Sequence, residues 1–279
     1  MKTDANTRLL GLIGNPVSHS LSPKMHSYIS SVYNDNYVYN AFQVEPSRIG
    51  DAIKGLCALG ACGVNVTAPY KSEVIKFIDF TDENAKMYNS VNTIKFKDSK
   101  SYGYCTDADG FCLMLENEKI QYKDKDILVL GAGGASKPIC IKLALDGAKS
   151  ITIINRTKEK ADELSRFIEG ICKTDIFSSR EHSRYDIVIN TTSVGMTPDI
   201  NSSPINDFSF VDKNTCAVDI IYNPAKTLFL EQMENHGAAK AVNGLGMLIY
   251  QGILSYEIFT DKKIDHNIYN DIKREVFKA

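Results

Sequence analysis

The sequence predicts an α/β protein with two domains, and three observations support this prediction. Apolar runs of strand length alternate with segments of helical periodicity along the chain. The stretch from Asp126 to Arg156 contains a strand, a glycine-rich turn, a helix and a second strand, which is how a Rossmann-type doubly wound domain begins. The length of 279 residues suits about two domains of ~150 residues each. We expect one domain over residues 1–107 plus 245–279, and a nucleotide-binding domain over residues 108–244.

The N-terminal part alternates by element type. Ser22 and Pro23 indicate the N-cap and the first helical position of a helix that continues to about Tyr33. The polar residues of this part gather at strand ends, where open α/β sheets bind ligands. The other expected elements are strands at Leu9–Ile13, Tyr37–Val44 and Cys62–Val66, helices at Ser47–Leu59 and Asp82–Tyr88, and a hairpin of Val91–Lys97 with Tyr102–Cys105.

The glycines of the turn after Ile127–Leu130 have a physical role. Without a Cβ the turn is tight, and backbone N–H groups can approach a pyrophosphate at the start of the following helix. The small residues of this turn are Gly131, Gly133, Gly134, Ala135 and Ser136, with Ser136 at the third small position of the dinucleotide motif. The turn therefore predicts a dinucleotide site, and the alternative is a glycine-rich turn without a ligand.

The end of the second strand indicates which dinucleotide is bound. A carboxylate about twenty residues past the glycines normally accepts hydrogen bonds from the adenosine ribose and would repel a 2′-phosphate. Here the corresponding corner reads Asn155, Arg156, Thr157 and then Lys160, so cations replace the carboxylate. This favours NADP over NAD. The alternative is that Arg156 and Lys160 lie on the solvated face of the next helix.

The rest of the sequence continues the nucleotide-binding domain and then leaves it. Gly246–Phe259 is apolar around most of its circumference, which predicts a helix buried between domains that returns the chain to the first domain. The elements before it are a helix at Glu159–Ile168, strands at Thr174–Phe177, Asp186–Asn190 and Cys216–Ile221, a helix at Thr227–His236 and a short strand at Lys240–Val242.

Composition excludes several classes of partner. A hydrophobic content of 43% and a charged content of 24% are typical of a soluble globular protein. The net charge of −2 gives no reason to expect nucleic acid or an anionic membrane, and no stretch approaches the ~20 apolar residues of a membrane span. Seven cysteines without a CxxC pair indicate reduced thiols, so we expect a cytoplasmic protein. The five histidines form no metal-binding motif.

Seven polar motifs, taken in order, resemble those of the shikimate dehydrogenase family. They are GNPVSHSLSPKMHS (14–27), NVTAPYK (65–71), SVNT (90–93), CTDADG (105–110), NTTSVGM (190–196), DIIYNP (219–224) and NGLGMLIYQG (243–252). The resemblance implies reversible reduction of 3-dehydroshikimate to shikimate with NADPH. It also implies a substrate domain and a cofactor domain with the active site in the cleft between them, in a monomer or a homodimer.

The resemblance assigns substrate-binding roles by motif. Ser20 and Ser22 correspond to the pair whose hydroxyls hold the substrate carboxylate, although capping a helix would also explain Ser22. The residues that would grip the ring hydroxyls or complete the pocket are Thr67, Asn92, Tyr222 and Gln251. On the cofactor side the resemblance adds Gly244 and Met247.

Lys71 and Asp107 are the pair that we expect to transfer the proton. Hydride delivery to a ketone carbon leaves negative charge on the oxygen, which a protonated lysine can neutralise, and a nearby carboxylate favours the protonated lysine. The alternatives are a surface lysine that starts a helix and an N-cap aspartate before Ala108–Glu118. Cys105 stands where the family often has asparagine, which puts details of substrate affinity in doubt.

Three other functions stay open on the sequence alone. The first is an NAD-dependent quinate/shikimate dehydrogenase, which Arg156 argues against. The second is a methylene-tetrahydrofolate dehydrogenase, which the paired serines and the motifs of Lys71 and Asp107 fit poorly. The third is a metabolite sensor that has kept the pocket and lost the chemistry.

Overall fold

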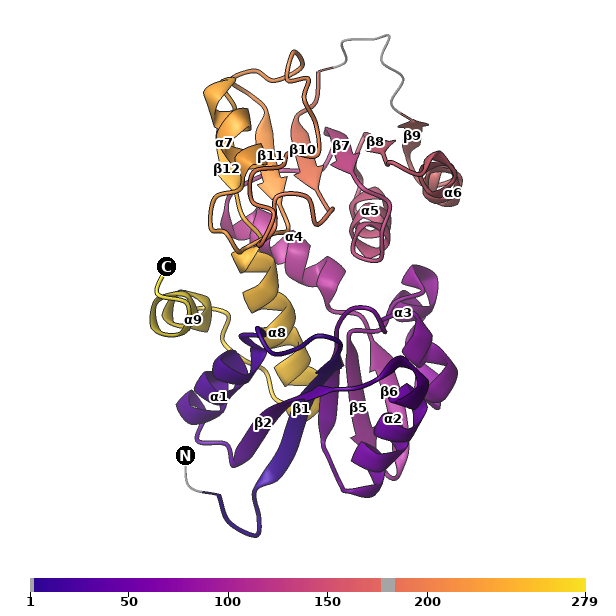
Figure 1. Cartoon of the computed structure of the whole chain (residues 1–279), viewed down its shortest axis with the longest axis vertical. Helices are drawn as coiled ribbons and strands as arrows, with labels where there is room; N and C mark the ends of the chain where they lie inside the picture. The colour runs from indigo at the N-terminus through magenta and orange to yellow at the C-terminus, as the bar shows by residue number, and fades with distance from the viewer. Residues whose placement is uncertain (1–2, 177–183) are drawn as a thin grey trace. The chain divides into compact units, whose positions relative to one another are not determined.

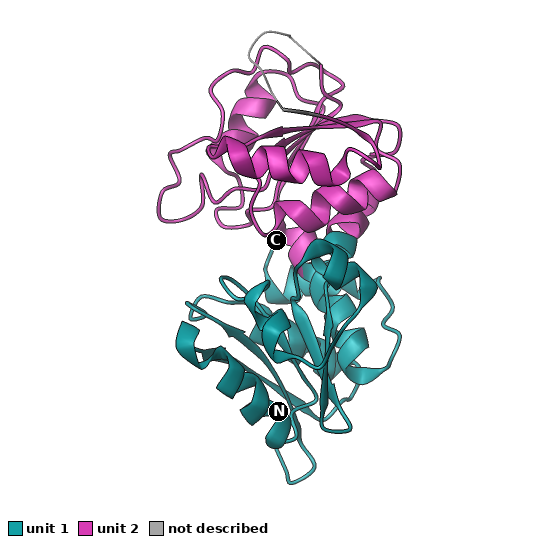
Figure 2. Ribbon diagram, turned by 90° about the vertical axis from the view of Figure 1, so that its right-hand side faces the viewer, with its two compact units in different colours: residues 1–110, 249–279 teal, residues 111–248 magenta. Residues whose placement is uncertain are grey.

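The computed structural model describes residues 3–176 and 184–279, and they form two compact units. Unit 1 contains the chain up to Gly110 together with Ile249–Ala279, and unit 2 contains Phe111–Leu248 (Figure 2). Both boundaries lie inside helices, α4 (Asp107–Asn117) and α8 (Leu245–Thr260). A sequence pattern does not mark a boundary inside a continuous helix, so the expected boundaries at 107 and 245 differ from these by a few residues.

Unit 1 is built on a mixed sheet with the strand order β2-β1-β3-β5-β6-β4 (Figure 1). β1 pairs in parallel with β2 and β3, whereas β5 is antiparallel to both β3 and β6. The carboxyl ends of β1, β3 and β6 and the beginning of β5 therefore share one edge of the sheet. The strands are β1 (Arg8–Gly14), β2 (Tyr37–Gln43), β3 (Gly63–Val66), β4 (Phe80–Thr81), β5 (Thr93–Lys97) and β6 (Lys100–Tyr104).

The hairpin of β5 and β6 is tighter than the sequence predicts. The loop consists of Asp98 and Ser99, both at positive φ (50° and 59°), which is the conformation of a two-residue turn that matches the twist of the strands. The expected loop of Asp98–Ser101 was too long because Ser101 pairs with Phe96 in the ladder.

The helices expected in unit 1 are present, with one correction at a terminus, and the structure adds two helical segments, at residues 73–77 and 268–276, that the sequence did not predict. α1 (Ser22–Val32) starts one residue earlier than expected: its N-cap is Leu21, already in a helical conformation (φ −91°, ψ −3°), and no side chain caps it. Ser22 is therefore not the N-cap. The other helical segments are η1 (Pro46–Arg48), α2 (Ile49–Ala58), η2 (Glu73–Phe77), α3 (Glu83–Tyr88) and α9 (Ile268–Val276).

Unit 2 is a doubly wound sheet in which each described pairing is parallel, and this confirms the predicted fold class. The strand order is β12-β11-β10-β7-β8-β9, so the order reverses between β7 and β10. The strands are β7 (Asp126–Leu130), β8 (Ser150–Ile154), β9 (Lys173–Ile176), β10 (Ile187–Asn190), β11 (Cys216–Asp219) and β12 (Lys240–Val242). Phe177, the expected end of the strand that corresponds to β9, lies outside the described residues.

The helices of unit 2 cover a sheet whose central strands are buried. Ile127–Leu130 is at most 2% exposed, as expected for a strand with helices on both faces. α5 (Ser136–Leu145) and α6 (Lys158–Ile168) contact β8, and α7 (Leu228–Asn235) contacts β11 and β12 (Figure 1). Pro138 lies within the first turn of α5, where its missing N–H costs no helical hydrogen bond.

Candidate active site

The edge of the unit 1 sheet brings together polar residues that are distant in sequence. Thr67 directly follows β3, Asn92 directly precedes β5, and Asp107 begins α4 shortly after β6. The strand directions place these three points at the same edge. Lys71 lies four residues after Thr67. Its carbonyl oxygen accepts a hydrogen bond from Val91 N–H at 2.7 Å, which ties it to the segment that carries Asn92 just before β5.

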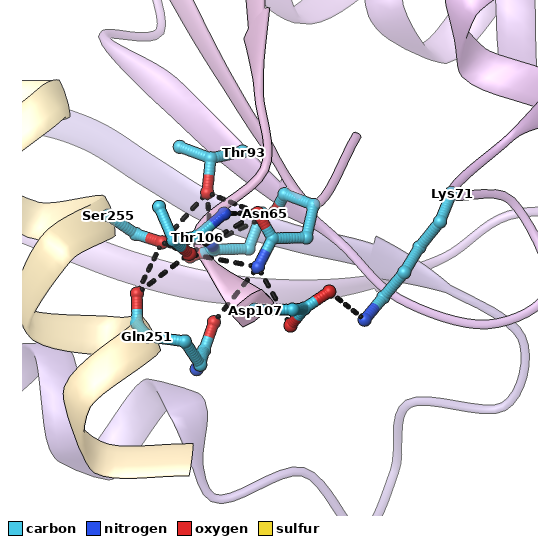
Figure 3. A network of polar contacts seen from close by, with 8 residues as sticks. Asn65, Lys71, Thr93, Thr106, Asp107, Gln251 and Ser255 are labelled. Atoms are coloured by element: carbon cyan, nitrogen blue, oxygen red, sulfur yellow. Dashed lines mark hydrogen bonds and ion pairs between the residues drawn. The ribbon is translucent and has the colours of Figure 1, made fainter. Parts of the chain in front are cut away.

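Lys71 and Asp107 form an ion pair at this edge. Figure 3 shows the ion pair of Lys71 Nζ with Asp107, and the distance from Nζ to Asp107 Oδ2 is 2.7 Å. The two side chains are 27% and 6% exposed. Burial alone would lower the pKa of Lys71, but the charge of Asp107 and its hydrogen bond outweigh burial and raise that pKa above its usual value. Asp107 points its carboxylate at Lys71 and Asn92. The ammonium group is thus held in its protonated form beside a partly open surface.

Asn92 connects this ion pair to helix α8. Its Nδ2 donates to Asp107 Oδ1 at 3.0 Å and to Gln251 Oε1 at 3.3 Å, while its Oδ1 accepts from Thr106 N–H at 2.8 Å. Gly110 makes this contact between α4 and α8 possible, because a Cβ there would lie 2.6 Å from Gln251 N. Four of the predicted residues, Lys71, Asn92, Asp107 and Gln251, therefore form one connected cluster.

The two serines lie in the loop before α1 and at its start. Ser20 and Ser22 are half-buried, and Ser20 Oγ accepts from Ser22 N–H at 3.3 Å. Since no side chain caps α1, capping does not account for Ser22. Thr67 is also half-buried, and its N–H donates to Ile13 O at 2.9 Å, which joins it to the end of β1.

The glycine turn of unit 2 lies at the point where the strand order reverses. Gly131 has φ +110°, and a Cβ there would lie 2.7 Å from Thr191 Oγ1, so only glycine fits. A Cβ at Gly133 or Gly134 would meet nothing within 4 Å, which leaves the turn open on that side. The buried Ser136 hydroxyl donates to Gly131 O at 2.7 Å and closes the turn from within. This open, hydrogen-bonded turn at a helix start fits a pyrophosphate.

The strand tip after β8 presents exposed cations. Asn155 Oδ1 accepts from Ala132 N–H at 3.1 Å and its Nδ2 donates to Thr157 O at 2.7 Å, so its side chain joins the glycine turn to this corner. Arg156, Thr157 and Lys160 are exposed. The remaining predicted residues of unit 2 lie apart along the chain: Tyr222 is half-buried after β11, whereas Gly244 and Met247 are buried around the start of α8.

Sequence reasoning missed one group of residues behind Asn92. The side chains of Asn65, Thr93, Thr106 and Ser255 are buried and hydrogen-bonded to one another (Figure 3). The available signal was weak: Ser255 is four residues after Gln251, so the two share a helix face.

Cys105, which departs from the family pattern, is 5% exposed. Burial raises the pKa of its thiol to about 12, so the thiol stays protonated beside the ion pair.

Unit 2 has a glycine turn at the point where the strand order of its doubly wound sheet reverses, and unit 1 has a lysine–carboxylate pair at its strand ends. Together these two features define the class of the protein as a nicotinamide-dependent dehydrogenase. Family models match the chain over residues 12–94 (shikimate dehydrogenase substrate binding domain), 114–224 (shikimate / quinate 5-dehydrogenase) and 244–266 (shikimate 5′-dehydrogenase C-terminal domain). The chain belongs to the shikimate dehydrogenase family, which confirms the resemblance of the motifs.

Individual relatives match nearly the whole chain. The shikimate dehydrogenase (NADP(+)) of Methanococcus aeolicus is 43% identical, with 95% of this chain and 96% of the relative covered. The protein of the same name from Caldanaerobacter subterraneus is 42% identical, with 99% and 100% covered. These matches leave the methylene-tetrahydrofolate dehydrogenase alternative without support.

Solved structures agree with the fold of the chain. A shikimate dehydrogenase in complex with NADP+ superposes with a TM-score of 0.89 at 39% identity, covering 97% of this chain and 96% of the other. The shikimate 5-dehydrogenase of Listeria monocytogenes in complex with shikimate and NAD gives a TM-score of 0.90 at 32% identity, with 98% of each chain covered.

Two further features of the described residues bear on partners. Each helix in that part of the chain is too short or too polar to cross a bilayer. The same residues contain no group of three or more His, Cys, Asp or Glu side chains placed to hold a metal ion.

Proposed function

We propose that this chain catalyses the reversible NADPH-dependent reduction of 3-dehydroshikimate to shikimate, with Lys71 and Asp107 as the proton-transfer pair. The observation that carries the proposal is the 2.7 Å ion pair of Lys71 Nζ and Asp107 Oδ2 at the sheet edge of unit 1. The family and the names of the relatives supply the substrate, and the pair supplies the acid that the reduction requires.

The chemistry follows from the charge state of Lys71. When hydride reaches the ketone carbon, negative charge develops on the oxygen, and the protonated Lys71 donates a proton to it. Asp107 keeps the pKa of Lys71 raised, so the lysine is an acid at neutral pH. Oxidation of shikimate requires the neutral amine, so its rate should rise with pH.

The substrate is held by polar groups around the pair. Asn92 and Gln251 are within hydrogen-bond distance of each other and, with Thr67, offer donors and acceptors for ring hydroxyls. Ser20 and Ser22 supply two hydroxyl donors for the carboxylate, and a hydrogen bond to a charged group contributes roughly 1.5–3 kcal/mol. Tyr222 is the substrate contact that we assign to unit 2.

The cofactor that fits unit 2 is NADP, which supplies the hydride when bound. Gly133, Gly134 and Ala135 line the open side of the turn before α5, where a pyrophosphate would lie. Lys158 and Lys160 lie in the first turn of α6 and Arg156 just before it, at the positive end of the helix dipole. Cations at that end are unfavourable unless an anion neutralises them, and a 2′-phosphate would do so. We assign Asn155 and Thr157 to shaping this corner, and Gly244 and Met247 to the nicotinamide end.

The decisive experiment is an absorbance assay with shikimate and NADP⁺. We expect Lys71→Ala to lower kcat about 10²-fold or more while NADPH still binds, because a general acid contributes about that factor. The exposed Lys76→Ala is the matched control and should keep wild-type turnover. Near wild-type turnover of Lys71→Ala would remove Lys71 from the reaction. Binding of shikimate by the wild type without any turnover would favour the metabolite-sensor alternative.

We also propose that the protein is located in the cytoplasm. All seven cysteines are free thiols, as expected for a protein of the reducing cytoplasm.

A further inference from the structure

A row of buried polar side chains lies behind the Lys71–Asp107 pair. The row consists of Asn65, Thr93, Thr106 and Ser255, whose side chains are drawn in Figure 3. Each is at most 6% exposed, and Ser255 is 0% exposed. Burying so many polar groups is unfavourable unless each has a partner, and here each has one. The arrangement of their protons determines which way the amide of Asn92 points.

The amide orientation of Asn92 is set by two donors. Thr106 N–H lies 2.8 Å from Asn92 Oδ1, and because a backbone N–H can only donate, the atom facing it must be the amide oxygen. Thr93 Oγ1 donates to the same oxygen at 3.0 Å. The NH₂ group of Asn92 therefore faces Asp107 Oδ1 at 3.0 Å. A flipped amide would set its oxygen against the carboxylate, where two acceptors repel.

Ser255 stands next in this row. Since Thr93 gives its proton to Asn92, the 2.7 Å contact between Thr93 Oγ1 and Ser255 Oγ needs the proton of Ser255. Ser255 in turn accepts from Asn65 Nδ2 at 2.9 Å, and Asn65 Oδ1 accepts from the Tyr39 hydroxyl at 2.9 Å. The same hydroxyl lies 2.8 Å from Gln251 O, a carbonyl that can accept from both Ser255 Oγ and Thr106 Oγ1, but its contact with Thr93 Oγ1 is the shorter of the two.

We propose that Ser255 is a positioning residue: through Thr93 it fixes the amide of Asn92, and through Asn92 it holds the Asp107 carboxylate against Lys71. Ser255 is fully buried, so it acts through its neighbours and touches no substrate. Ser255 lies one turn after Gln251 on α8, so the helix that carries Gln251 also holds Thr93 in place through Ser255. The inference rests on the proposed role of the Lys71–Asp107 pair.

The test uses two variants and their combination. Ser255→Ala removes the hydroxyl, and Thr93→Val removes the donor to Asn92 while keeping the volume of the side chain. We expect each to lower kcat/KM for shikimate oxidation about 10-fold, and the double variant to lose little more than the larger single effect, because both break the same row. The pH at half-maximal oxidation should also move to lower pH, since Lys71 loses part of the support of Asp107.

Ser30→Ala is the matched control, because Ser30 is also a buried serine of unit 1 and its hydroxyl donates to Asp35 O, outside this row. It should leave kcat/KM and the pH profile unchanged, and all variants should bind NADP⁺ as the wild type does. Wild-type kcat/KM in Ser255→Ala, or additive losses with an unmoved pH profile, would overturn the inference. If Ser255→Ala does not fold, Thr93→Val alone decides by its pH profile. Absence of turnover in the wild type would instead refute the proposed function.

Discussion

At the scale of single residues, Asp107 keeps the partly buried Lys71 in its charged form. Burial works against a charged lysine, and the carboxylate 2.7 Å away reverses that effect. The carboxylate is in turn held by Asn92 Nδ2 at 3.0 Å. The acid of the proposed reaction is therefore a property of three side chains from separate segments.

Replacing Asp107 with asparagine keeps the shape of the side chain and removes its charge. We expect the pKa of Lys71 to fall, because burial then acts unopposed, so the pH at half-maximal shikimate oxidation should move down. Reduction of 3-dehydroshikimate at neutral pH should lose rate, since less Lys71 is protonated. A pH–rate profile measures both, and an unmoved or higher midpoint would contradict the proposed coupling.

His26 is the residue that should make the protein sensitive to acid. Its ring is 1% exposed, stacks on Tyr39 with 4.3 Å between ring centroids, and neither ring nitrogen has a hydrogen-bond partner among the described residues. Burial lowers the pKa of His26 from 6.5 to about 3. The stacked ring is therefore neutral in the folded protein, while the unfolded chain takes up a proton near the ordinary pKa.

Stability from a neutral His26 is present above the unfolded pKa of 6.5 and is lost as pH falls toward the folded value of about 3. Between pH 6.5 and about pH 5.5 this loss approaches roughly 1 kcal/mol. His26→Phe should remove this part of the pH dependence, measured as the free energy of unfolding in urea at both pH values. His19→Gln, at an exposed histidine, is the control and should keep the wild-type slope.

At the scale of elements, the contact of α4 with α8 determines whether the unit 1 cluster forms. α4 carries Asp107 and α8 carries Gln251, and they approach closely at Gly110, where a Cβ would lie 2.6–2.9 Å from Gln251 N, Cβ and Cα. Helical propensity alone would favour alanine over glycine at such a position by about 1 kcal/mol. Packing and propensity therefore oppose each other at this residue.

Gly110→Ala tests which effect is larger. We expect packing to win, with a loss of about 1–3 kcal/mol in the free energy of unfolding and a lower kcat/KM, because α4 must shift away from Gln251. Gly55→Ala in α2 is the matched control, since a Cβ there meets nothing within 4 Å, and it should keep or slightly increase stability. A Gly110→Ala variant as stable and active as the Gly55→Ala variant would contradict the close contact.

At the scale of the whole molecule, a single chain carries two sheets in two compact units. Unit 2 alone holds the glycine turn and the cations of the strand tip, and unit 1 holds the lysine–carboxylate pair. A ligand that binds only the folded chain stabilises it by an amount set by its concentration relative to Kd. Cofactor binding should therefore be visible in unfolding as well as in turnover.

NADP⁺ at about 100 times its Kd should add about 2.7 kcal/mol to the free energy of unfolding. At the same concentration NAD⁺ should add less, because it has no phosphate for Arg156. Arg156→Ala should remove most of the difference between the two cofactors, whereas Arg166→Ala, at the other end of α6, should preserve it. An unchanged preference in Arg156→Ala would mean that the 2′-phosphate is bound elsewhere.

The sequence by itself determined the features that depend on local chemistry. Hydrophobic periodicity located most of the strands and helices, but not α9 or the short β4 and η2. A glycine with φ +110° at Gly131 belongs to a turn that few other sequences can form. The ordered motifs then identified the family and named Lys71, Asn92, Asp107 and Gln251, which the structure brings into one cluster.

Only the tertiary structure decided what depends on partners distant in sequence. Ser22 was expected to cap α1 from its residue type, but the backbone of Leu21 is already helical there. Ser255 was not singled out, because its hydrogen-bond partners Asn65 and Thr93 are 190 and 162 residues away and a buried serine has no periodic signal. Local patterns record the preference of the chain for an element. The orientation of the Asn92 amide depends instead on Thr106 N–H, 14 residues away, and on Ser255, which acts through the neighbouring Thr93 and is 162 residues from it.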